Sequence, residues 1–151
     1  EPYSASVVSL EKNVDASVVG VDVDPQAVER AREGVYDNVK GIKEPGFVDD
    51  VSNHLHRSEE GVRVLDHVSD RVSFRNLDVA EVRASGFDVV LCRNLLIYLN
   101  DEKKVDVVGS LTDALDEGGY LVLGKTERLP SRYSDVFDAV DSRLRVYRYE
   151  G

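Results

Sequence analysis

The residue types most able to do chemistry stand at the end of an apolar run, FDVVLC, that predicts a buried parallel strand. Cys92, Arg93 and Asn94 fall where this strand reaches its carboxyl end, and ligands in open α/β sheets bind just beyond such ends. The following residues become apolar again, which predicts a helical turn that places Tyr98 over the same crevice. The alternative is structural: Arg93 pairs with a surface carboxylate and Tyr98 is buried in the core.

Asp22 is a second candidate, near the end of the valine-rich run SVVGVDVD. In nucleotide-binding α/β folds, an acid at a strand end accepts hydrogen bonds from the ribose hydroxyl groups of the cofactor. This position therefore allows a nucleoside-cofactor site. The alternative is a helix cap, because Asp24 directly precedes Pro25 and can accept the free N–H groups of a helix.

A histidine pair, His54 and His56, raises the question of a metal site. No cysteine or carboxylate cluster accompanies the pair at a ligand spacing. We therefore expect no metal, and we expect both imidazoles at the surface.

The candidate side chains need a sheet whose parallel strands end at a common edge. Strand and helix patterns alternate along the chain, and the last two strands read as an antiparallel pair, which together predict a doubly wound, Rossmann-like α/β sheet, mostly parallel with an antiparallel carboxyl-terminal edge. The predicted helices are residues 1–13, a helix from Pro25, and a helix from Asp101 that stops at Gly118 or Gly119; the predicted strands are residues 17–24, 73–79, 87–92, 120–124, 137–142 and 144–150.

Residues 36–70 are the least regular part of the sequence. Residues 61–74, which overlap the end of this segment, alternate apolar and polar side chains around a Ser-Asp pair. This pattern predicts a small antiparallel hairpin added to the sheet. The second arm runs on into a strand that ends at Asn76. Residues 61–74 are therefore assigned to an inserted β-subdomain.

Length and charge limit the classes of protein. A chain of 151 residues fits one domain with one core. Its 19 Lys and Arg residues against 29 Asp and Glu residues give a net charge of -10, which disfavours nucleic acid and anionic membrane as partners. The excess of Asp and the scarcity of Lys are typical of a halophile, although an ordinary acidic cytosolic protein is the alternative.

Cys92 is the single cysteine, so an intrachain disulfide is excluded and the cytoplasm is the expected compartment. The sequence holds no apolar run near the roughly 20 residues that span a bilayer. We therefore expect no direct membrane insertion.

The acidic composition predicts that folding strengthens in molar KCl. Salt screens the self-repulsion that a net charge of -10 imposes on the compact state. The measurement is the melting temperature followed by circular dichroism in dilute and in molar KCl. A melting temperature that stays flat over this range would remove the halophile interpretation.

Six motifs, taken in order, resemble the chemotaxis receptor methyltransferases of the CheR type along essentially the whole chain. They are EPYS, VDVDPQAVERAREGVY, FRNLD, FDVVLCRNLLIYLN, DEGGYLVLGKTE and VYRY. The resemblance implies a class I methyltransferase, here of haloarchaeal type, that moves a methyl group from S-adenosylmethionine (SAM) to glutamate side chains of chemoreceptors and leaves S-adenosylhomocysteine. It also implies the cytoplasmic domains of transmembrane chemoreceptors as partners, and we expect a monomer.

The resemblance also implies roles for individual residues. Arg93 and Tyr98 match the pair nearest the transferred methyl group, and Asp22 matches the acid that contacts the ribose. The implied cofactor-binding residues are Glu1, Asp22, Asn76, Leu77, Cys92, Arg93 and Asn94.

The chain also departs from that family. The helical amino-terminal domain, the first and central strand of the sheet, and its glycine-bearing turn have no counterpart in this sequence. We therefore expect an amino-terminally truncated methyltransferase domain over residues 1–151 that binds SAM poorly in isolation. The hairpin stands where some members dock a receptor's tail peptide by adding a strand. A noncatalytic methyltransferase-like module that binds a receptor or a signalling partner is the alternative function.

Overall fold

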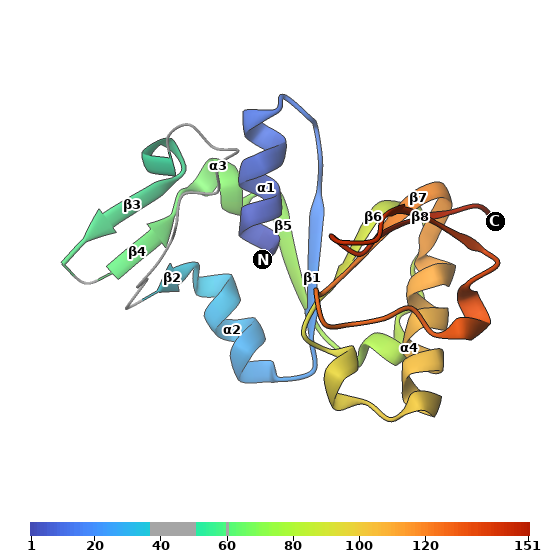
Figure 1. The fold of residues 1–151 in the computed structure, drawn as a ribbon. Helices are drawn as coiled ribbons and strands as arrows, with labels where there is room; N and C mark the ends of the chain where they lie inside the picture. Colours follow the sequence, from blue (N-terminus) through green and yellow to red (C-terminus); the bar gives the residue numbers. More distant parts are fainter. Residues whose placement is uncertain (37–50, 60) are drawn as a thin grey trace. The chain divides into compact units, whose positions relative to one another are not determined.

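The computed structural model describes residues 1–36, 51–59 and 61–151 (Figure 1). These residues form two compact units, Glu1–Leu77 and Asp78–Gly151. Among the described residues, each unit has a cluster of buried apolar side chains: Val7, Val64 and Val68 in the first unit, and a larger cluster around Leu121 in the second.

The first unit holds a parallel strand pair, β1 with β5, and an antiparallel sheet in the order β2-β4-β3. Its elements are α1 (Pro2–Glu11), β1 (Val18–Asp22), α2 (Pro25–Glu33), β2 (Val35–Tyr36), the 3-10 helix η1 (Val51–Asn53), β3 (Leu55–Ser58), β4 (Gly61–Val64), α3 (Asp66–Ser69) and β5 (Val72–Asn76).

Helix α1 begins at Pro2, where the missing N–H of proline is no loss. It is tied to its unit by side-chain hydroxyl groups: Tyr3 donates to the carbonyl of Ala31 at 2.7 Å, and the buried Ser6 donates to the carbonyl of Val68 at 3.1 Å. Burial of Tyr3, with a smaller contribution from the nearby Tyr36, raises the pKa of its phenol above the ordinary value. The helix predicted for residues 1–13 is therefore confirmed.

Strand β1 needs a glycine in its middle. A Cβ atom at Gly20 would lie 2.7 Å from Cδ1 of Phe74 and 2.9 Å from Cγ of Pro2, so only glycine leaves room for the start of α1 and for the Phe74 ring. The strand leads into α2 through the predicted cap, because the Asp24 carboxylate accepts the N–H of Gln26 at 2.9 Å. This predicted strand, turn and helix are confirmed.

The hairpin predicted for residues 61–74 does not form. β4 pairs antiparallel with β3 and β2, whereas β5 pairs in parallel with β1. Between β4 and β5, the chain turns through α3, which buries Val68 completely. Alternation along the sequence marks a strand but does not choose its partner, and here burial of Val68 favours a helical turn over a hairpin. Of the irregular segment, residues 37–50 and 60 lie outside the described residues.

His54 corrects the expectation of two surface histidines. The residue is 7% exposed, with Nε2 2.6 Å from the carboxylate of Glu11 and Nδ1 3.0 Å from Nε2 of His67. His56 is exposed. Within the described ranges, no group of three or more His, Cys, Asp or Glu side chains is arranged to hold a metal ion.

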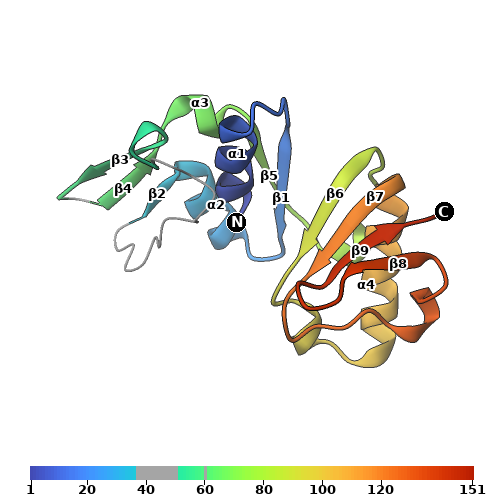
Figure 2. The ribbon, with the colours of Figure 1, turned by 45° about the horizontal axis from the view of Figure 1, so that its top comes forward.

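The second unit is one mixed sheet, in the order β6-β7-β9-β8, with helix α4 on one face (Figure 2). β6 and β7 are parallel, and β9 and β8 add an antiparallel edge, as predicted. The elements are the 3-10 helix η2 (Val79–Glu81), β6 (Phe87–Cys92), the 3-10 helix η3 (Leu96–Tyr98), α4 (Asp101–Ala114), β7 (Leu115–Leu123), the 3-10 helix η4 (Ser131–Tyr133), β8 (Phe137–Asp141) and β9 (Val146–Tyr149).

Helix α4 supplies the core of this unit. Asn100 caps it by accepting a hydrogen bond from the N–H of Lys103 at 2.9 Å. Acidic residues lie in its first turn, where their negative charge is stabilised by the positive end of the helix dipole. Its inner face, which includes Val108 and Leu111, packs with Leu121 and Leu123 of β7.

Two features of this unit differ from the predictions. Helix α4 ends at Ala114 instead of Gly118 or Gly119, because the parallel ladder between β6 and β7 already begins at Leu115. β6 is not buried throughout, because Val89 is 51% exposed. In the part of the chain that the structure describes, no helix is long and apolar enough to cross a membrane.

Candidate functional site

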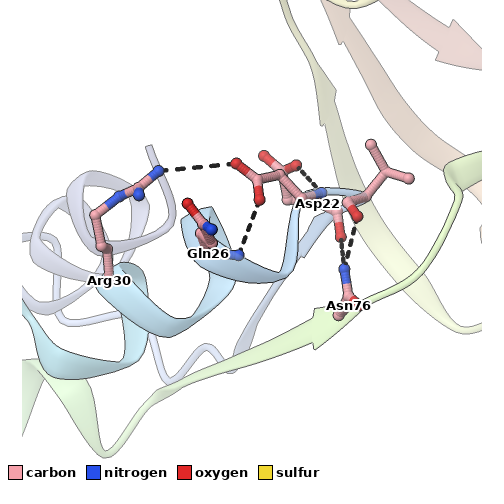
Figure 3. Close-up of polar contacts among 6 residues, drawn as sticks. Asp22, Gln26, Arg30 and Asn76 are labelled. Carbon is pink, nitrogen blue, oxygen red and sulfur yellow. Dashed lines mark hydrogen bonds and ion pairs between the residues drawn. The ribbon is translucent and has the colours of Figure 1, made fainter.

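In the first unit, two neighbouring strands end side by side at the predicted residues. Asp22 and Asn76 are register partners at the carboxyl ends of β1 and β5. The Asn76 amide Nδ2 donates to the carbonyl oxygens of Asp22, at 3.0 Å, and Val23, at 2.9 Å (Figure 3). The N–H of Leu77 also donates to the carbonyl of Asp22, at 3.1 Å. The nitrogen of Asn76 is thus used to hold the main chain after β1.

The structure separates the two carboxylates that the sequence left as alternatives. Asp24 caps α2 and lies 3.8 Å from the guanidinium of Arg30. Asp22 is exposed, and its Oδ1 accepts the N–H of Asp24 at 2.8 Å, which fixes the direction of the carboxylate. No described residue contributes a hydrogen bond or ion pair to Oδ2 of Asp22. An oriented carboxylate with one unoccupied oxygen at a strand end is suited to accept ligand hydroxyl groups.

Glu1, the remaining predicted residue of this unit, is exposed at the N-cap of α1, and its carbonyl accepts the N–H of Ala5 at 3.0 Å. The structure therefore brings Asp22, Asn76 and Leu77 together by hydrogen bonds and places Glu1 at the start of a helix in the same unit.

In the second unit, the polar residues after β6 occupy a sharp turn. Cys92 is 5% exposed and packs in the core, whereas Arg93 and Asn94 are exposed. Asn94 has a φ of 59°, in the left-handed region that few residues other than glycine adopt. The turn therefore ends β6 abruptly and carries the chain directly into η3.

Tyr98 ends η3 with its side chain 80% exposed, so the alternative that it is a core aromatic is wrong. Leu96, two residues earlier, is 1% exposed and anchors the same short helix in the core. A guanidinium and a phenol are both hydrogen-bond donors that suit an anion such as a carboxylate.

Sequence reasoning missed Glu127. This residue is 2% exposed, and among the described residues its carboxylate accepts four main-chain N–H groups. Its position in the sequence is the one available signal: Glu127 follows the end of β7 by four residues, and the carboxyl ends of neighbouring parallel strands share one edge of a sheet. Nothing in the local pattern, however, distinguishes a buried glutamate from a surface one.

The amino-acid sequence of the chain is similar to that of known methyltransferases. The family of CheR methyltransferase SAM-binding domains matches residues 1–146. A chemotaxis protein methyltransferase of Vibrio parahaemolyticus is 32% identical to the chain, over 93% of the chain and 54% of that relative. A probable chemotaxis protein methyltransferase of Rhizobium etli is 30% identical, over 99% of the chain and 58% of that relative. The chain spans about half the length of these relatives.

Solved structures support the fold. A magnesium protoporphyrin IX methyltransferase from Synechocystis, crystallised with bound SAM, superimposes with a TM-score of 0.52 at 15% identity, over 97% of this chain and 63% of that one. A possible exported protein from Bordetella parapertussis gives a TM-score of 0.54 at 18% identity, over 95% of this chain and 44% of that one. These likenesses confirm the α/β methyltransferase fold predicted from the sequence.

Proposed function

We propose that this chain, which belongs to the family of CheR methyltransferase SAM-binding domains, helps to transfer a methyl group from SAM to glutamate side chains of chemoreceptors. The observation that carries the proposal is the Asp22 carboxylate, held by the N–H of Asp24 at a strand end with its second oxygen unoccupied by the described residues. The names of the relatives support a role in chemotaxis.

The described residues of the first unit fit a nucleoside cofactor. Ribose hydroxyl groups are donors that need an acceptor, and Asp22 offers a preoriented carboxylate oxygen. Asn76 and Leu77, which are bonded to the same strand end, would line the cofactor beside it, and Glu1 would bind it from the start of α1. For Cys92, Arg93 and Asn94 of the second unit, the cofactor-binding role comes from the family resemblance of the motif that carries them.

When bound, SAM supplies a methyl group on a positively charged sulfur, and S-adenosylhomocysteine is the product. A glutamate side chain is ionised at neutral pH, so it attacks without a general base and the protein's task is alignment. Arg93 would grip the substrate carboxylate with its planar guanidinium, and the Tyr98 hydroxyl would donate to an oxygen of the same carboxylate. Both side chains are exposed and therefore accessible to a protein substrate.

In this proposal, the partner is the cytoplasmic domain of a transmembrane chemoreceptor. The protein therefore acts in the cytoplasm. It acts there as a monomer. The net charge of -10 supports a protein partner over nucleic acid.

The direct test is cofactor binding by the complete gene product and its Asp22→Ala variant. Asp22→Ala should weaken SAM binding by about 1 to 3 kcal/mol, because charge-assisted hydrogen bonds to the ribose are lost. The SAM affinity of Asp22→Asn should lie between those of the parent and Asp22→Ala, since the asparagine amide oxygen can still accept a hydrogen bond from the N–H of Asp24. Isothermal titration calorimetry with SAM and with S-adenosylhomocysteine measures the dissociation constants.

A suitable control is Asp113→Ala, which removes an exposed carboxylate of α4 and should leave the affinity unchanged. Equal affinity of the parent and Asp22→Ala would remove Asp22 from the site. If the complete gene product binds neither SAM nor its product, the methyltransferase proposal itself fails.

A further inference from the structure

We propose that Glu127 is a positioning residue for methyl transfer, because its carboxylate sets the conformation of the turn that carries Arg93 and Tyr98. This inference rests on the proposed function. Oε2 of Glu127 accepts hydrogen bonds from the N–H groups of Asn94 at 3.0 Å and Gly124 at 2.7 Å. Oε1 accepts hydrogen bonds from the N–H groups of Leu95 at 2.8 Å and Leu96 at 2.7 Å.

The clamped N–H groups are ones that the local fold leaves without partners. η3 begins after Leu95, which provides no side-chain cap, and Asn94 is held in a left-handed conformation that ends the β6 ladder. A buried N–H without a partner is destabilising. Glu127 therefore caps η3 from a distant part of the chain, and an ionised acceptor makes these hydrogen bonds stronger than a neutral one would.

The clamp also joins the ends of two neighbouring strands. β6 and β7 are parallel and in register at Cys92 and Leu123, so Gly124 and the turn after Cys92 start from the same edge of the sheet. The Glu127 carboxylate bonds to both, and its own N–H donates to the carbonyl of Gly124 at 2.9 Å.

Gly124 makes room for this carboxylate. A Cβ atom at this position would collide with Oε2 of Glu127 and would lie 3.2 Å from its Cδ. The same Cβ would lie 3.4 Å from the nitrogen of Asn94. A side chain at Gly124 would therefore displace the carboxylate from the N–H groups it serves.

The position of the clamped groups in the chain connects this contact to the reaction. Arg93 directly precedes the first of them in the turn, Asn94, and Tyr98 follows the last, Leu96, by two residues. The direction of both exposed side chains is thus set by backbone that Glu127 holds. A reacting group misplaced by about 1 Å can lower a rate about 100-fold even when the fold is intact.

The test compares Glu127→Gln with the parent in the complete gene product. Glutamine keeps the size and one acceptor oxygen but turns an NH₂ group toward main-chain donors. We expect the kcat for methyl transfer to a receptor fragment to fall about 100-fold, and the affinity for SAM to fall by a smaller factor than the kcat. Independently of activity, amide exchange without cofactor should quicken tenfold or more at residues 94–96 and 124, and not in the middle of α4.

Glu117→Gln is the matched control, because it makes the same chemical change at an exposed position of β7. If Glu127→Gln does not fold, Gly124→Ala tests the same clamp and should give the same pattern. Parent-level kcat in the folded variant, with only a lower melting temperature, would overturn the proposal, as would unchanged exchange at residues 94–96. If the parent itself transfers no methyl group, the proposed function fails, whereas the exchange measurement still decides whether Glu127 holds the turn.

Discussion

Replacing Arg93 with alanine is expected to lower methyl transfer to a receptor fragment about 100-fold or more, because a charged donor that acts on the transition state is lost. The loss of SAM affinity should be smaller than the loss of turnover, since Arg93 acts mainly on the substrate carboxylate. Tyr98→Phe removes one hydroxyl donor and should give a smaller loss in the same direction. The measurement is transfer of labelled methyl from SAM to a cognate receptor fragment, run beside cofactor titrations on the same variants.

Two further variants sharpen this experiment. Arg93→Lys should recover only part of the rate, because an ammonium group cannot reproduce the planar fork that binds both oxygens of a carboxylate. Arg132→Ala removes an exposed arginine of η4 in the same unit and should behave as the parent. If Arg93→Ala and Tyr98→Phe both methylate at the parent rate, these residues are structural. If the parent binds SAM but methylates no receptor, the noncatalytic alternative is the better description.

Leu96→Ala should lower the free energy of unfolding by about 2 to 5 kcal/mol, which is the usual cost of truncating a fully buried leucine. Leu96 is the first residue of η3, is 1% exposed and packs in the core. Denaturation by urea, followed by circular dichroism, measures the change through the midpoint at constant slope.

The neighbouring residue gives a close control for this experiment. Ile97 lies on the same short helix and is 48% exposed, so Ile97→Ala should stay within about 0.5 kcal/mol of the parent. Equal destabilisation by both variants would mean that Leu96 is not the residue that holds η3 to the core.

Local chemistry let the sequence determine most of the elements. Pro2 marks the start of α1, Asp24 the start of α2, and Asp101 with the acid after it the start of α4. Proline and acidic residues suit the first turn of a helix, and a side chain directly before the helix can accept its free N–H groups. Strands β1, β5, β6, β8 and β9 were likewise predicted from apolar patterning. The strand ends at Asp22 and Asn76 followed directly from these assignments.

Predictions that depended on strand partners were less successful. The hairpin at residues 61–74 was wrong because β4 pairs with β3 and β2, and β5 pairs with β1. The end of α4 was misplaced for the same reason, since Leu115 pairs with Phe87 of β6 and so belongs to β7 instead of the helix. An amphipathic or alternating pattern states that a face is buried, but the partner is chosen by contacts between residues far apart in the chain.

The sequence by itself therefore determined the fold class, the family resemblance and which strand ends carry Asp22, Asn76 and Arg93. Only the tertiary structure decided how these residues are held. It showed that Asp24 is the cap and Asp22 is not, and it buried Glu127 against N–H groups more than 30 residues away in sequence. The physical reason is that a carboxylate accepts any N–H that the fold presents, so its partners are fixed by three-dimensional packing and not by its neighbours in the chain.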